Sequence, residues 1–420
     1  ALQVARLQQE QLGFGSATAW AAQTALWQLD PENQSGASGE NQDKKAALLP
    51  RLAESLASKA SSQLTGSHLT ETENFLLYMR CLDIQSKWEE KLSVLEERME
   101  NIAEQTNPRE DVLRELKASC LAKLGRNEEV RVEVAKLLLL HCDNWDFWKL
   151  YLSHDDSMNM VESQEVIEKI IEKSKEEAYP LRGPHLAKIE RELLLLKKEE
   201  GGTAVMSKLM QQMVDYYKKF AQRASCTTSD ILRYLQYLLE HGSSNDAESL
   251  LESIQRDGFR SVPNSDDPKE RRRQLRGYIF GIQISYHVLS KHPNLESKWM
   301  PDWKEILQVW KDFKAFDNAD QAQKENRPGD ELILLTVQQL QRSGKESQSS
   351  KANCALSAAI LDAAIAYSPH NAYLKIAAIL AYGNLSAVRR SWELFRNLFI
   401  KHIQHESCAY LILPVLHGGG

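Results

Sequence analysis

Two histidine-containing stretches carry side chains that could act as bases or metal ligands. His185 lies in "LRGPHLAK", directly before a strongly apolar run, while His402 and His405 lie three residues apart in "KHIQH". Two histidines at this spacing lie on one face of a helix and could bind zinc. The sequence offers no cysteine or carboxylate cluster that completes such a site, so we expect no metal there.

The residues around His185 predict the start of a helix rather than a catalytic site. Gly183 can adopt backbone angles that other residues avoid, and Pro184 suits a first helical turn, where its missing N–H costs nothing. Apolar residues then follow at helical spacing: Leu186, Ile189, Leu193 and Leu196. We therefore interpret His185 as a first-turn residue, where the helix dipole disfavours its protonated form.

One short segment, "KERRRQLRGY", concentrates positive charge near an expected helix start. Its basic residues are Lys269, Arg271, Arg272, Arg273 and Arg276. Such a basic patch could contact phosphate groups, for example those of ribosomal RNA. Asp266, Asp267 and Glu270 lie beside it, so the alternative is a solvated helix face held by salt bridges.

The composition indicates a foldable chain with a mild negative charge. Of its 420 residues, 42% are hydrophobic and 26% are charged, and the net charge is −6. This balance argues against a general nucleic-acid binder but leaves room for local basic patches. No apolar run approaches the ~20 residues that a membrane helix needs. The six cysteines lack paired spacing, which is typical of reduced thiols in a cytosolic protein.

Helical periodicity runs through the chain, and strand patterns are nearly absent. In "TENFLLYMRCLDIQSKWEEKLSVLEERM", two apolar stripes separated by a polar break predict a helix hairpin. In the next block, Gly125 fits the turn of a tetratricopeptide unit of about 34 residues, and Trp148 fits the aromatic position that opens the following unit. Ala118 and Val130 then take the positions where neighbouring helices approach closely.

A second such unit lies near the end, in "ALSAAILDAAIAYSPHNAYLKIAAILAYGNLSAVRRSWELFRNLF". Its Ala-rich helix should stop at the Ser-Pro-His-Asn stretch, and a further helix pair is expected around Gly383. We interpret the stripe of Trp303, Trp310 and Phe313 as core, with a partner-facing role as the alternative. Together these units predict an all-α fold: an α-α superhelix, or tetratricopeptide-like solenoid, rather than a closed bundle.

We expect one continuous helical-repeat solenoid over residues 1–420. Residues 30–45 are polar and rich in Gly and Ser, which predicts a flexible surface loop. Residues 256–268 form an expected inter-helix linker that ends in a helix-starting Asp-Asp-Pro. Because the chain begins without Met and already in helical register, we also expect a segment of a longer protein.

Several short islands, in this order along the chain, resemble a known family. They are "LLPRLAESLASK", "ETENFLLYMRCLDIQSKWEEKL", "DNWDFWKLYL", "RGPHLAK" and "KHIQHESCAYL". Together they are similar to the auxiliary, non-catalytic subunit of the NatB N-terminal acetyltransferase complex. The similarity covers most of the chain but is dense only in these islands, of which "RGPHLAK" and "KHIQH" are the specific ones.

The resemblance implies a cytoplasmic scaffold that wraps and activates a small catalytic subunit and anchors it to the ribosome. That partner would acetylate nascent chains that begin with Met-Asp, Met-Glu, Met-Asn or Met-Gln. By their match to the family motifs, seven residues are expected to face partners: Arg182, His185, Lys188, Lys401, His402, Gln404 and His405. The basic patch is the expected ribosome-facing surface.

The sequence lacks the motif by which acetyltransferases hold acetyl-CoA. That loop needs Gln or Arg, then Gly three residues later and Gly or Ala five residues later. Gln255, Gln274 and Gln341 meet the first condition but not the second. The phosphate-loop, nucleophile-elbow and zinc-protease motifs are absent as well. We therefore predict a non-enzyme without cofactors; the alternative to the NatB interpretation is a tetratricopeptide scaffold of another cytosolic complex.

Overall fold

The computed structural model describes residues 50–55, 71–100, 109–154, 160–176, 180–198, 202–224, 226–256, 262–316, 327–343, 349–400 and 408–418. Every regular element within these ranges is a helix, which confirms the predicted all-α fold. The chain divides into two compact units, Ala1–Lys188 and Ile189–Gly420, and the boundary falls inside a helix. The polar segment 30–45 lies outside the described residues, so its flexibility stays a prediction.

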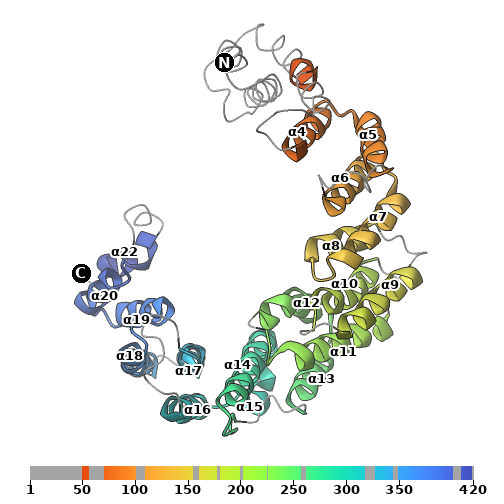
Figure 1. The fold of residues 1–420 in the computed structure, drawn as a ribbon. Coiled ribbons are helices and arrows are strands. Elements are labelled where there is room, and N and C mark those ends of the chain that lie inside the picture. Colours follow the sequence, from red (N-terminus) through yellow and green to blue (C-terminus); the bar gives the residue numbers. More distant parts are fainter. Residues whose placement is uncertain are drawn as a thin grey trace, which may run out of the picture. The chain divides into compact units, whose positions relative to one another are not determined.

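The first unit is a series of helices in which most neighbours along the chain pack together (Figure 1). Its described helices are α4 (Glu71–Ile84), α5 (Trp88–Glu100), α6 (Glu110–Lys123), α7 (Asn127–Leu140), α8 (Trp145–Ser153), α9 (Met160–Lys173), the 3-10 helix η3 (Ser174–Glu176) and the first turns of α10 (Gly183–Lys197). The expected hairpin is the α4–α5 pair, whose buried faces include Met79, Leu82, Leu92 and Leu95.

The helix pair α6–α7 has the features that the sequence predicted for a tetratricopeptide unit. Gly125 lies in the connecting turn with φ +72°, a left-handed conformation that favours glycine. Ala118 of α6, Val130 of α7 and Trp148 of α8 are all fully buried. The three positions that the repeat pattern predicted to be buried therefore belong to the core.

The second unit continues the same pattern of consecutive packed helices. After α10 its described elements are α11 (Thr203–Phe220), α12 (Thr227–His241), α13 (Ser244–Ile254), α14 (Pro268–Lys291), η5 (Pro293–Leu295), α15 (Glu296–Trp299), α16 (Trp303–Phe316), α17 (Asp330–Ser343), α18 (Ser349–Tyr367), α19 (Ala372–Asn384), α20 (Val388–Arg396), η7 (Ala409–Leu411) and α22 (Leu413–Gly418). In the expected linker, residues 262–267 are not helical, and α14 begins at Pro268.

The helices α18, α19 and α20 form the repeat expected near the end of the chain. Asn371 caps α19 by accepting hydrogen bonds from the backbone N–H groups of Tyr373 and Leu374. The turn from α19 to α20 differs from a glycine turn, because its left-handed residue is Ser386 with φ +57°. Gly383 lies within α19, and a Cβ atom there would lie 2.7 Å from Cγ2 of Val415, so glycine permits the contact with α22.

The aromatic stripe of α16 belongs mainly to the core, as predicted. Trp310 and Phe313 are buried, whereas Trp303 is only half-buried. The ring of Trp310 contacts Tyr367 of α18 edge-on, with centroids 6.0 Å apart. These large side chains join α16 to the helices that follow it and provide much of the apolar contact in this part of the unit.

Candidate partner-binding sites

The string "RGPHLAK" begins helix α10, and a specific contact fixes its start. The backbone N–H of Gly183 donates a hydrogen bond to Oδ1 of Asp143, 2.5 Å away. Pro184 follows at the second helical position, where no intrahelical N–H is needed. An acceptor carboxylate at this end also suits the positive pole of the helix dipole. The predicted helix start is therefore confirmed.

The partner of this helix start is the segment "DNWDFW", which the sequence predicted as the opening of a repeat and as a separate island of the family resemblance. Asn144 caps α8 through the backbone N–H groups of Asp146 and Phe147. The indole N–H of Trp148 donates to the carbonyl of Cys142 at 2.8 Å. Two islands some forty residues apart thus form one joint, which we call the α8–α10 joint and which consists of Cys142, Asp143, Asn144, Trp148 and Gly183.

The three predicted partner-facing residues of this string lie around the joint. Arg182, His185 and Lys188 are half-buried. Lys188 Nζ lies 4.0 Å from Glu168 of α9, a distance at the limit of an ion pair. Their role in partner binding stays a prediction. Of the second predicted group, Lys401, His402, Gln404 and His405 all lie outside the described residues.

In the second unit, α10 carries buried charged residues that were not predicted from the sequence. Glu190 accepts hydrogen bonds from the Tyr234 hydroxyl at 2.9 Å and from Arg233 at 2.8 Å. Burial, followed by the nearby Glu190 carboxylate, raises the pKa of Tyr234 far above its ordinary value. Glu192 is paired with Arg191 and Lys208. These hydrogen bonds and ion pairs link α10 to α11 and α12. They also provide the partners that the buried carboxylates of Glu190 and Glu192 require.

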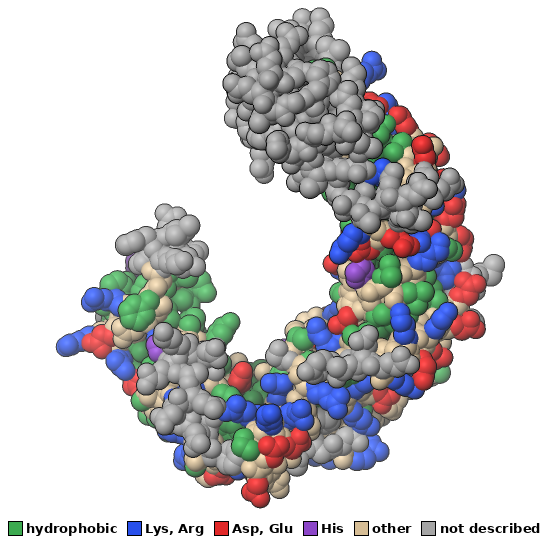
Figure 2. Space-filling model, viewed as in Figure 1, with side chains coloured by type: hydrophobic (Ala, Val, Ile, Leu, Met, Phe, Trp, Pro, Cys, Tyr) green, Lys and Arg blue, Asp and Glu red, His purple; other side chains and the backbone are tan. Residues whose placement is uncertain are grey.

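The predicted basic patch lies on the first turns of α14, where Figure 2 shows lysine and arginine side chains gathered. Asp267 caps this helix through the backbone N–H groups of Lys269 and Glu270. Lys269, Arg272 and Arg273 are exposed, and Arg273 lies 3.5 Å from Glu270.

Arg276 has a structural role within this patch. It donates to the backbone carbonyls of Gln222 and Arg223, at 3.5 and 3.0 Å, and so links α14 to the end of α11. Arg271 is half-buried like Arg276. Fewer basic residues of this patch are fully exposed to solvent, therefore, than the sequence predicted.

No group of three or more His, Cys, Asp and Glu side chains in the described ranges is arranged to hold a metal ion. No described helix is both long and apolar enough to cross a membrane. The described chain consists of packed helices whose surfaces carry patches of charged side chains.

Comparison with known families shows which family the chain belongs to. A family model described as "N-acetyltransferase B complex (NatB) non catalytic subunit" matches residues 145–420, which is more than half of the chain. The chain belongs to this family. The match confirms the resemblance seen in the short islands and agrees with the expectation that the protein is not itself the acetyltransferase. A second model, "Psidin, N-terminal TPR repeats region", matches residues 18–138 and confirms the tetratricopeptide prediction.

Individual proteins are similar to this chain over most of its length. The "N-alpha-acetyltransferase 25, NatB auxiliary subunit" of Homo sapiens is 24% identical, with 92% of this chain and 42% of that protein covered. The "Phagocyte signaling-impaired protein" of Aedes aegypti is 23% identical, with 92% and 40% covered. The chain therefore spans about two fifths of the length of these curated relatives.

A solved structure is also similar. It is described as "Structure of Naa15/Naa10 bound to HypK-THB". The match covers 94% of this chain and 52% of the chain in that structure. The TM-score is 0.49 and the sequence identity is 15%.

Proposed function

We propose that this chain is the scaffold segment of a NatB-type auxiliary subunit, which binds and activates a separate catalytic subunit. The observation that carries the proposal is the match of residues 145–420 to the NatB non-catalytic family. Consecutive helix pairs support it, since such arrays bury an apolar core between neighbours and leave extended surfaces for partners. The catalytic subunit supplies acetyl-CoA binding and chemistry, and the complex acts on Met-Asp, Met-Glu, Met-Asn and Met-Gln N-termini.

Two surfaces are proposed for the partners. Arg182, His185 and Lys188, beside the α8–α10 joint, contact the catalytic subunit together with the "KHIQH" segment. The exposed part of the basic patch, Lys269, Arg272 and Arg273, contacts ribosomal RNA in the cytoplasm. Its charge suits phosphate, and the overall net charge of −6 limits contact with nucleic acid elsewhere on the chain.

Co-expression tests the proposal. The full-length protein that carries this segment should copurify with a NatB-type catalytic subunit in a stoichiometric complex through size-exclusion chromatography. A catalytic subunit of another N-terminal acetyltransferase class serves as the control and should not copurify. If neither forms a complex, or both bind equally well, the proposed role as a NatB scaffold fails and the alternative, a tetratricopeptide scaffold of another assembly, takes its place.

A further inference from the structure

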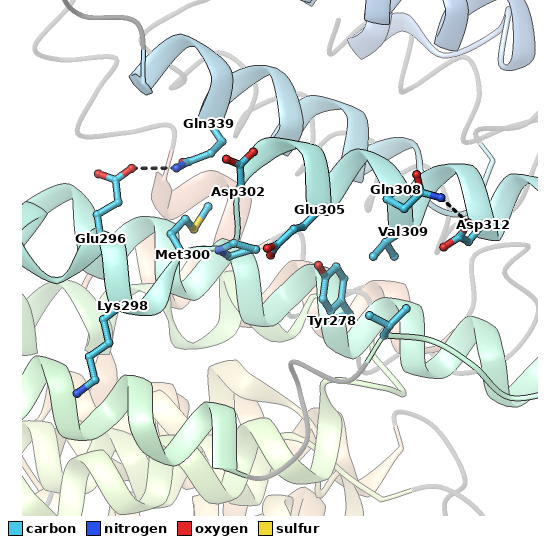
Figure 3. A pocket seen from close by; sticks show the side chains of 12 residues that line it. Tyr278, Glu296, Lys298, Met300, Asp302, Glu305, Gln308, Val309, Asp312 and Gln339 are labelled. Carbon is cyan, nitrogen blue, oxygen red and sulfur yellow. Dashed lines mark hydrogen bonds between the residues drawn. The ribbon is translucent and has the colours of Figure 1, made fainter.

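An elongated pocket in the second unit has no role in the function proposed above. It lies where α14, α15, α16 and α17 meet and has a volume of about 840 Å³ (Figure 3). Its floor is apolar, because Tyr278, Met300 and Val309 line it and are each nearly buried. Val262 adds an exposed apolar side chain at the edge. An apolar floor of this kind favours a ligand that brings some hydrophobic surface.

The wall formed by α16 is acidic. Asp302, Glu305 and Asp312 line the pocket (Figure 3), and their spacing of three and seven residues predicts that they lie toward one side of the helix. All three are exposed. Asp302 accepts from the backbone N–H of Lys304, and Asp312 accepts from the amide of Gln308. Among the described residues none of the three forms a salt bridge. We call this pocket, with its apolar floor and these three carboxylates, the acidic groove.

The lysines near the acidic groove have other partners. Lys298 lines the groove, but its ammonium lies 2.6 Å from Glu248 and over the ring of Trp299. Figure 3 shows this side chain pointing away from Asp302. Lys314 of α16 lies over the rings that join α16 to α18. Neither of these two lysines therefore pairs with Asp302, Glu305 or Asp312 in the described contacts.

One buried polar atom also lacks a partner at this groove. Gln339 of α17 lines it and is only 8% exposed. Its amide nitrogen donates to Glu296 at 2.9 Å, while its oxygen accepts no hydrogen bond from the described residues. A buried acceptor without a donor is costly, so a ligand N–H group would stabilise this side chain once the amide turns its oxygen toward the groove.

We propose that the acidic groove binds an extended, lysine- or arginine-rich segment of a partner protein. From Asp302, directly before α16, to Asp312 within it, the three carboxylates follow a rise of ten residues, or about 15 Å, a length that about five residues of extended peptide cover. Cationic side chains would pair with Asp302, Glu305 and Asp312, and the alternating apolar side chains would contact the floor. Nucleic acid is excluded, because its phosphates would face the same carboxylates. The inference does not depend on the acetyltransferase assignment.

Peptide binding by the full-length protein tests this inference. The probe is the fluorescein-labelled peptide Gly-Lys-Leu-Lys-Val-Lys-Leu-Lys-Gly, and its binding is followed by fluorescence anisotropy at low salt. The triple variant Asp302→Asn, Glu305→Gln, Asp312→Asn should bind about tenfold more weakly, since three ion pairs are lost. The same peptide with Gln in place of Lys should bind the unaltered protein as weakly as the variant binds the lysine peptide.

A matched control variant separates the groove from general acidity. Glu115, Glu165 and Glu240 are exposed and form no salt bridge with described residues, so their replacement by Gln changes the net charge equally. This control should bind the lysine peptide within about twofold of the unaltered protein. The proposal is overturned if both triple variants lose affinity equally, if the Gln peptide binds as tightly as the Lys peptide, or if the unaltered protein binds neither. Circular dichroism confirms that each variant is folded.

Discussion

A Cβ atom at Gly183 would lie only 3.0 Å from Nε1 of Trp148. The same position is 3.1 Å from the Cα and carbonyl oxygen of Asp143, so backbone as well as side chain closes the space. Because the Trp148 indole also donates to the Cys142 carbonyl, the ring moves aside only by losing that hydrogen bond. A larger residue at position 183 would therefore force Trp148 or the Asp143 backbone to shift by a few tenths of an ångström.

Gly183→Ala should therefore destabilise the protein. We expect the free energy of unfolding to fall by about 1–3 kcal/mol, the usual range when a core is overpacked. Chemical denaturation followed by circular dichroism measures the change. Gly202→Ala is the comparison, because a Cβ atom there meets nothing within 4 Å; as the N-cap of α11 it should lose less, about 0.5–1 kcal/mol. Equal losses in the two variants would contradict the account of the α8–α10 joint.

Asp143→Ala should cost about 1–2 kcal/mol, because it removes a carboxylate acceptor from the start of a helix. The effect should not add to that of Gly183→Ala, since both changes disturb the same contact. A double-mutant cycle measures the coupling, which we expect to reach at least about 0.5 kcal/mol. Full additivity would show that Asp143 and Gly183 act separately.

Much of the local structure was predictable from the sequence, because the signals were local. Gly125 marked the α6–α7 turn, and Asp267 with Pro268 marked the start of α14. The turn at Ser386 carried no such signal, since only its position between packed helices holds a serine at positive φ.

The long-range contacts of α10 were not predictable in the same way. The resemblance pointed to "DNWDFW" and "RGPHLAK" separately, but their contact through Asp143 and Gly183 depends on how α8 and α10 pack. Glu190 and Glu192 were not foreseen as buried, because the donors that satisfy them come from α11 and α12. Only the folded arrangement of these helices reveals such partners.

The basic patch gives a prediction for the ribosome. Arg272→Glu with Arg273→Glu should reduce co-sedimentation of the full-length protein with ribosomes at low salt, because contacts to phosphate are lost. The dependence of binding on salt should become shallower as well. Lys311→Glu with Lys351→Glu makes the same charge change at two exposed sites and should leave co-sedimentation unchanged. Unchanged sedimentation of the first variant would exclude this surface as the ribosome contact.

Thiol reactivity should distinguish the cysteines. Burial, followed by the nearby Glu54 carboxylate, raises the pKa of Cys81 to about 11. At pH 8 only about one molecule in a thousand then carries the reactive thiolate. We expect iodoacetamide to label partly exposed Cys226 in the native protein but to label Cys81 only after unfolding, as read by peptide mass spectrometry. Labelling of both at the same rate would contradict the buried position of Cys81.

Acetylation of defined peptides tests the central claim most directly. The kcat/KM of a NatB-type catalytic subunit is measured with Met-Asp and Met-Glu peptides, with and without the full-length protein that carries this chain. The account predicts a rise of about tenfold or more for these peptides and no rise for a Ser-Ala peptide. An unchanged kcat/KM for Met-Asp and Met-Glu, or an equal rise for all three peptides, would contradict it.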